Sequence, residues 1–183
     1  LAGGCSFAAM FAYITGGPDL FIAQQGLSPR AYALIFAANA AGILGANYLN
    51  SYLVRRVGPA ILVTLASALG WIAALGLVAA CRPAVVDLPG VIAALFVVVA
   101  VTGLLGANCV GLLMQRFDGN AGAAAALFGA GQFGFGMVTS AAVSFFHDGS
   151  ARPMAATIAV ASTLSLAGSL LLRRGTASRG GRP

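Results

Sequence analysis

The chain has 183 residues, of which 60% are hydrophobic and only 8% are charged. Soluble domains average about half apolar and about a quarter charged residues, so this composition excludes an ordinary water-soluble fold. The formal net charge of +6 comes from arginines between apolar blocks and in the tail, without interleaved aromatic residues, so we expect a lipid bilayer and no nucleic acid as partner.

Apolar runs of roughly the 20 residues that cross a bilayer occur six times along the chain. None of these runs contains Asp, Glu, Lys, Arg or His. The prolines lie at or beyond the edges of the runs, where a helix can begin or end without losing an internal hydrogen bond. The sequence therefore predicts an all-α integral membrane protein, a bundle of six transmembrane helices at residues 1–15, 31–53, 59–80, 89–115, 121–146 and 154–172.

Residues 1–172 are expected to form one transmembrane unit, followed by an Arg- and Gly-rich tail at residues 173–183. The first run is short, because 15 helical residues rise only about 22 Å against a hydrocarbon core of about 30 Å. The chain also begins with Leu1 rather than Met. We therefore expect that part of the first span, and chain upstream of it, is missing.

The arginines are divided unequally between the two sets of connections. The set that includes the tail holds seven arginines and the other set holds three. The positive-inside rule places the arginine-rich set in the cytoplasm, so we expect both chain ends there. The first set is Arg55, Arg56, Arg116, Arg173, Arg174, Arg179 and Arg182, and the second is Arg30, Arg82 and Arg152.

Polar and aromatic side chains interrupt the apolar spans. Asn39, Asn47 and Asn50 lie within about 80° of one another on the second span, at about 100° per helical residue. Polar groups at this depth either hydrogen-bond between helices or line a water-filled substrate pathway, and the sequence leaves both interpretations open. Aromatic rings likewise serve packing or ligand contact. The candidates for lining a substrate cavity are Tyr13, Asn39, Asn47, Asn108, Gln132 and Phe135.

The fifth predicted span is rich in glycine. Helices in lipid approach one another closely where their side chains are small. We therefore expect Gly131, Gly134 and Gly136 to serve helix packing. Such smooth surfaces also suit helices that rock against each other.

The residues that catalysis would need are not grouped in the sequence. Cys5, Cys81 and Cys109 have neither a C-x-x-C spacing nor a neighbouring His, so the sequence predicts no metal site and no cofactor. His147 and Asp148 stand beside Ser150, an arrangement more typical of a solvated turn than of a catalytic triad. We therefore expect no enzyme activity and no catalytic residue.

The segment from Tyr48 to Pro59, with Asn50, Arg55, Arg56 and Gly58, resembles the short cytoplasmic loop of the major facilitator superfamily. The resemblance is to the form found in Bcr/CflA-type drug-resistance transporters. Two further stretches, residues 26–39 and 119–155, are similar to the same family, so the likeness covers nearly the whole chain. It implies that the six spans form the C-terminal half of a twelve-helix carrier of the bacterial inner membrane, built from two inverted three-helix repeats.

The same resemblance implies export of small, often amphipathic compounds in exchange for protons. The small-molecule substrate would bind near mid-membrane between two halves, with alternating access by rocking. Because the predicted spans hold no ionisable group, we expect the coupling residue in the missing N-terminal six-helix half. A carrier of sugars or metabolites remains an alternative, as does a half-size, non-catalytic membrane protein that homodimerises.

Overall fold

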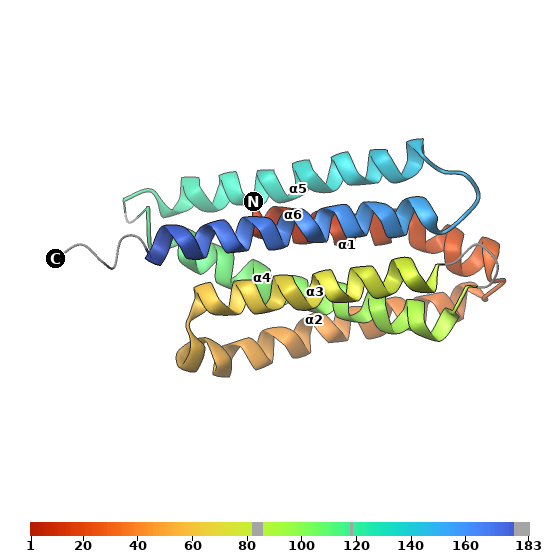
Figure 1. Cartoon of the computed structure of the whole chain (residues 1–183), viewed down its shortest axis with the longest axis horizontal. Coiled ribbons are helices and arrows are strands. Elements are labelled where there is room, and N and C mark those ends of the chain that lie inside the picture. Colours follow the sequence, from red (N-terminus) through yellow and green to blue (C-terminus); the bar gives the residue numbers. More distant parts are fainter. Residues whose placement is uncertain (82–85, 118, 178–183) are drawn as a thin grey trace.

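The computed structural model describes residues 1–81, 86–117 and 119–177, with side chains as far as Arg173. This part of the chain forms an all-α bundle of six helices that are long and apolar enough to cross a membrane (Figure 1). The prediction of a six-helix membrane protein is confirmed. Arg82 and residues 178–183 of the predicted tail lie outside the described residues. The elements are α1 Ala2–Pro18, the π-helical turn η1 Asp19–Gln24, α2 Pro29–Val57, α3 Pro59–Ala80, α4 Leu88–Met114, α5 Ala121–Phe145 and α6 Arg152–Ala177.

The first helix continues beyond the predicted end at Thr15, through Pro18 and η1 to Gln24. Proline removes a backbone donor, which is why the sequence indicated a break. In a bilayer no water replaces a lost helical hydrogen bond, so the chain stays helical and passes into a wider π-turn. This span therefore contains Asp19 and an internal proline, which corrects the expectations of spans without acidic residues and of prolines only at edges.

Helix starts are set by short polar side chains and proline. The hydroxyl of Ser28 accepts a hydrogen bond from the Ala31 N–H at 3.2 Å, and the Asp87 carboxylate accepts one from the Gly90 N–H at 3.3 Å. Proline stands in the first turn of α2, α3 and α4, where its missing N–H costs nothing. Gly58, with φ of +83°, is the one residue between α2 and α3.

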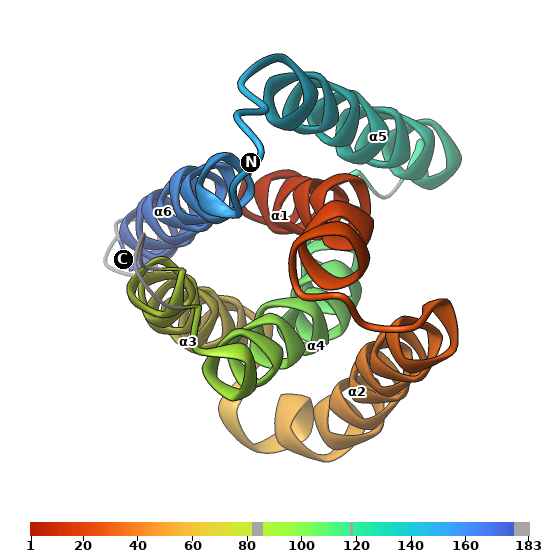
Figure 2. The same cartoon turned by 90° about the vertical axis from the view of Figure 1, so that its right-hand side faces the viewer.

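Four helices, α1, α3, α4 and α6, surround the centre of the bundle, while α2 lies outside α4 and α5 outside α1 (Figure 2). Only 11% of the most apolar stretch of α2 is buried, and the same holds for α5, against 33–50% for the other four spans. In Figure 2, α2 and α5 flank the same side of the molecule, with α1 and α4 between them. This side is therefore framed by two poorly covered apolar helices.

Glycines bring α5 against α1 and α2 against α4. A Cβ atom on Gly4 of α1 would lie 2.7 Å from the ring of Phe135, and one on Gly136 of α5 would lie 2.9 Å from the ring of Phe11. Each glycine thus accommodates an aromatic ring of the neighbouring helix. On the other side of the bundle, a Cβ on Gly103 of α4 would lie 2.9 Å from the backbone oxygen of Ile43 in α2. Small residues set both contacts, as expected for helices in lipid.

The two ends of the bundle differ in charge. The α2–α3 and α4–α5 connections and the C-terminal end of α6 lie at one end, with Arg55, Arg56 and Arg116, and the other three connections lie at the opposite end (Figure 1). Leu1 lies beside Gly168 of α6, so α1 begins part-way along the bundle. We call the first end the arginine-rich end. Its cytoplasmic orientation stays a prediction.

Candidate functional site

Four aromatic side chains gather where α1 and η1 meet α2. The rings of Tyr13 and Phe36 stack with centroids 6.0 Å apart, the rings of Phe21 and Tyr32 lie 5.7 Å apart, and those of Tyr32 and Phe36 lie 6.3 Å apart. Gly17 leaves room for this cluster, because a Cβ there would lie 2.8 Å from the Tyr32 hydroxyl oxygen and 3.1 Å from the Tyr13 ring. The aromatic cluster of Tyr13, Phe21, Tyr32 and Phe36 connects the start of α2 with α1 and η1.

Two buried polar atoms in this region lack partners. The Tyr13 hydroxyl lies close to the side chains of Tyr32 and Asn39. Tyr13 is 1% exposed and Asn39 is 2% exposed, yet no described group forms a well-aligned hydrogen bond with the Tyr13 hydroxyl or with the Asn39 Nδ2. A buried polar group left without a partner costs about 1–3 kcal/mol. The Tyr13 hydroxyl and the Asn39 amide are therefore two donor groups held side by side.

Asn108, the third candidate, is engaged in a bond between helices. Its Nδ2 donates to the Asn50 Oδ1 at 2.6 Å and to the Leu104 carbonyl oxygen at 2.8 Å. Asn50 and Asn108 are 8% and 3% exposed. In this structure the pair joins α2 to α4, which is one of the two roles considered for polar residues at this depth.

The other three candidates are more accessible. Asn47 is exposed on α2, with its Nδ2 beside Gly103 of α4, and Gln132 is half-buried on α5. Phe135 is 40% exposed and also lines a groove of about 590 Å³ between α1, α5 and α6. The structure thus brings Tyr13 and Asn39 together but does not join all six candidates in one cavity, so the cavity assignment stays a prediction.

The predicted loop motif is mostly helical. Asn50, Arg55 and Arg56 lie within α2, the two arginines in its last turn, and Gly58 alone connects α2 to α3. The helix continues from the predicted end of the span at residue 53 to Val57, so Arg55 and Arg56 are helical and lie beside the partial negative charge of its C-terminus. The role of the motif stays a prediction. Arg55 and Arg56 are exposed and lie at the arginine-rich end.

Among the three α5 glycines predicted to serve helix packing, Gly136 alone contacts another helix in the described part of the chain. Gly136 faces Phe11, as described above, whereas no atom of the described chain outside their own helix lies within 4 Å of the Cβ position at Gly131 or Gly134. A packing role of Gly131 and Gly134 stays a prediction that needs a partner outside the described residues.

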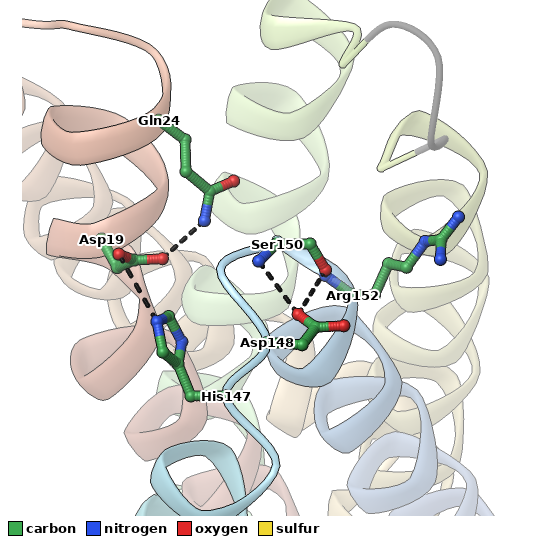
Figure 3. A network of polar contacts seen from close by, with 6 residues as sticks. All are labelled: Asp19, Gln24, His147, Asp148, Ser150 and Arg152. Carbon is green, nitrogen blue, oxygen red and sulfur yellow. Dashed lines mark hydrogen bonds and ion pairs between the residues drawn. The ribbon is translucent and has the colours of Figure 1, made fainter.

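Sequence reasoning missed a polar network at the end opposite the arginine-rich end (Figure 3). The His147 Nε2 lies 3.9 Å from the Asp19 Oδ1, and the amide of Gln24 donates to the other oxygen of Asp19. Asp19 was overlooked because the first span was expected to end at Thr15. The pair connects η1 with the α5–α6 loop, and both side chains are partly exposed.

The same loop contains a separate turn around Asp148. The Asp148 carboxylate accepts hydrogen bonds from the Ser150 N–H at 2.9 Å and from its hydroxyl at 2.6 Å. In Figure 3, His147 points to Asp19 and not to Ser150. The three residues therefore form no relay for a nucleophile. In the part of the chain that the structure describes, no three His, Cys, Asp or Glu side chains are grouped to hold a metal ion.

Replacing Asp148 by alanine is expected to reduce stability at neutral pH but not in strong acid. The Ser150 hydroxyl, followed by the Ser150 N–H, lowers the pKa of the Asp148 carboxyl below its ordinary value. A lowered pKa in the folded state adds stability above the unfolded pKa of about 3.9, and that stability is lost as the pH falls through the folded pKa. Thermal unfolding at pH 7 and in strong acid, below both pKa values, measures the difference.

Ser150→Ala is the matched variant. It removes the hydroxyl that donates to Asp148, and it leaves the Asp148 carboxylate and the backbone N–H of residue 150 in place. The thermal stability of this variant should depend less on pH than that of the parent protein. A stability loss in Asp148→Ala that is equal at both pH values contradicts the account.

Comparison with known proteins identifies a relative of this chain. The chain is 27% identical over 179 residues to a bicyclomycin resistance protein homolog of Haemophilus influenzae. The aligned region is 96% of this chain but spans 44% of the relative's length. No family model matches the chain, and no solved structure matches it.

The similarity and the fold agree on a coarse description. The six apolar helices indicate a multi-pass membrane protein, and a relative named for drug resistance agrees with this. The relative is more than twice as long as the aligned region, so its other half has no counterpart in the described helices.

Proposed function

We propose that this chain forms one six-helix half of a membrane transporter that exports small, drug-like or amphipathic compounds. The observation that carries the proposal is the pair of poorly covered helices, α2 and α5, on one side of the bundle. Apolar helices of a complete carrier are covered by lipid or by other helices, and substrate sites lie between the halves. A second six-helix half on this face would enclose a cavity between itself, α1 and α4.

Drug export, rather than uptake of a sugar or metabolite, is supported by the relative's name. The relative is a bicyclomycin resistance protein homolog, and the resemblance to Bcr/CflA-type transporters in the major facilitator superfamily points the same way. The proposal places the arginine-rich end in the cytoplasm of a bacterial cell and the bundle in the inner membrane.

Proton exchange is the proposed source of energy. Among the described spans, Asp19 is the one acidic side chain, and it lies in the last turns of its span, partly exposed. A coupling carboxylate normally lies deeper and faces the bundle interior or a cavity. The proposal therefore keeps the coupling residue in the other half of the carrier.

Expression of the complete gene in a bacterial strain that lacks its own efflux pumps tests the proposal. Bicyclomycin is the first probe, and the measurements are the inhibitory concentration and accumulation in energised cells with and without a protonophore. Resistance that the protonophore abolishes is the expected result. Unchanged susceptibility to bicyclomycin and to a panel of amphipathic cations overturns drug export.

Tyr13→Phe tests the role of the aromatic cluster in the same assay. The variant removes the buried hydroxyl and keeps the ring. Because one hydrogen bond contributes about 0.5–1.5 kcal/mol, the apparent substrate affinity should fall by about 2–10-fold. The matched control is Tyr48→Phe on the exposed surface of α2, where the hydroxyl is hydrogen-bonded to the Tyr52 hydroxyl. Equal behaviour of the two variants removes Tyr13 from the site.

A further inference from the structure

A small cavity that four serines help to line lies among α1, α3, α4 and α6, away from the residues considered for transport. Every residue that lines it is buried. Four of them are serines from three helices: Ser6 of α1, Ser67 of α3, and Ser162 and Ser165 of α6. Their exposed fractions are 2–5%. The apolar wall comes from Val98, Val101 and Leu105 of α4, and Ala9 and Gly70 complete the lining.

The hydroxyls of this serine cluster are only partly satisfied by the protein. Ser165 donates to the Ala2 carbonyl oxygen at 2.9 Å. The Ser67 and Ser165 oxygens are 3.4 Å apart, which is longer than the usual O–H···O range of about 2.5–3.0 Å. Ser6 and Ser162 donate to no described group. A hydroxyl kept from bulk water is stabilised by a hydrogen-bond partner, and the cavity is the space in which such a partner can lie.

The size of the cavity is that of a site for one water molecule. The space open to the centre of a water molecule is about 10 Å³, and one bound water needs about 10–15 Å³ by the same measure. A buried water typically makes 2–4 hydrogen bonds, which the four serines can supply. No acidic residue lines the cavity, so nothing there compensates the charge of a dehydrated cation.

We infer that the serine cluster binds a single water molecule that hydrogen-bonds α1, α3 and α6 together. Helices in lipid gain little from hydrophobic burial when they associate, so hydrogen bonds between them contribute to keeping them together. The water links the first span to the third and sixth at the centre of the bundle. The ring of four helices is thereby held as one unit, while α2 and α5 lie outside it.

The effect of Ser162→Ala on stability has opposite signs for a wet and a dry cavity. If the water is present, the variant removes one of its partners, and the melting temperature of the purified protein should fall by about 2 °C or more. If the cavity is dry, the variant removes an unsatisfied buried hydroxyl, and the melting temperature should stay or rise. A fall supports the bound water, and no change or a rise overturns it.

Ser169→Ala is the matched control. Ser169 is fully buried on α6, but its hydroxyl bonds the Leu166 carbonyl oxygen of its own helix and does not line the cavity. It should melt within about 1 °C of the parent. An equal fall in Ser169→Ala and Ser162→Ala overturns the assignment, since it shows a general cost of losing a hydroxyl. Ser6→Ala repeats the test from α1 if the α6 variant fails to fold.

A second measurement detects the water without a substitution. Brief radiolysis of the purified protein generates hydroxyl radicals from bound as well as bulk water, and mass spectrometry locates the oxidised side chains. Leu105 lines the cavity, whereas Leu95 is equally buried in α4 and does not. Stronger oxidation of Leu105 supports the bound water, and equal protection of both leucines overturns it.

Discussion

Replacing Gly103 by valine is expected to weaken the packing of α2 against α4. A Cβ atom at this position would lie 2.9 Å from the Ile43 backbone oxygen, 3.1 Å from the Ile43 Cγ2 and 3.1 Å from the Asn47 Nδ2. The nearest of these atoms belongs to the backbone of α2, so a change of side-chain rotamer cannot relieve the clash. The two Cγ atoms of valine add further volume, and α2 has to shift away from α4. Forcing extra volume into a packed contact costs about 1–3 kcal/mol. Reversible unfolding in mixed micelles with increasing SDS measures the loss.

Gly106→Val provides the control on the same helix. It carries the same change in helix propensity, but no atom outside its own helix lies within 4 Å of the Cβ position at Gly106 in the described chain. The difference between the two variants isolates the contact with α2. Equal losses from both substitutions show that propensity, and not close approach, decides the effect.

The second large effect is expected from Asn108→Leu. The variant removes the donor to the Asn50 Oδ1 and leaves that oxygen buried between α2 and α4. An unpaired buried acceptor costs about 1–3 kcal/mol, although measured bonds between membrane helices average about 0.6 kcal/mol. We therefore expect a loss of about 1–2 kcal/mol in the free energy of unfolding. The same SDS titration measures it.

A double-mutant cycle separates the bond from the change in packing. Asn50→Leu leaves the Asn108 amide with its bond to Leu104 but without Asn50. The double variant removes both polar groups, so its loss should be smaller than the sum of the two single losses. Strictly additive losses contradict a direct interaction between the two side chains.

The helical content of the chain followed from hydropathy, whereas the ends of some helices did not. α3 begins and ends where the sequence predicted, because proline and glycine punctuate it and apolar residues fill it. The first span exceeded its predicted end, because the Gly-Gly-Pro segment that would end a helix in water does not end one in lipid. Asp19 was missed for that reason.

The polar residues show a similar division. Their depth in the membrane could be predicted, because each lies within an apolar run. Their partners could not, because Asn50 and Asn108 are 58 residues apart in the chain and meet only when α2 packs on α4. The serine cluster carried no signal in the sequence either, since its members come from three helices and serine is ordinary in such spans.

The sequence by itself determined the class of the protein, the number of spans and the unequal distribution of arginines. These properties depend on composition and on local periodicity, to which lipid responds residue by residue. Only the tertiary structure decided that α2 and α5 lie outside, that Tyr13 faces Asn39, and that Asn108 bonds Asn50. Helices in lipid have no hydrophobic force to choose their neighbours, so the choice depends on the fit of small residues and on a few hydrogen bonds between distant parts of the chain.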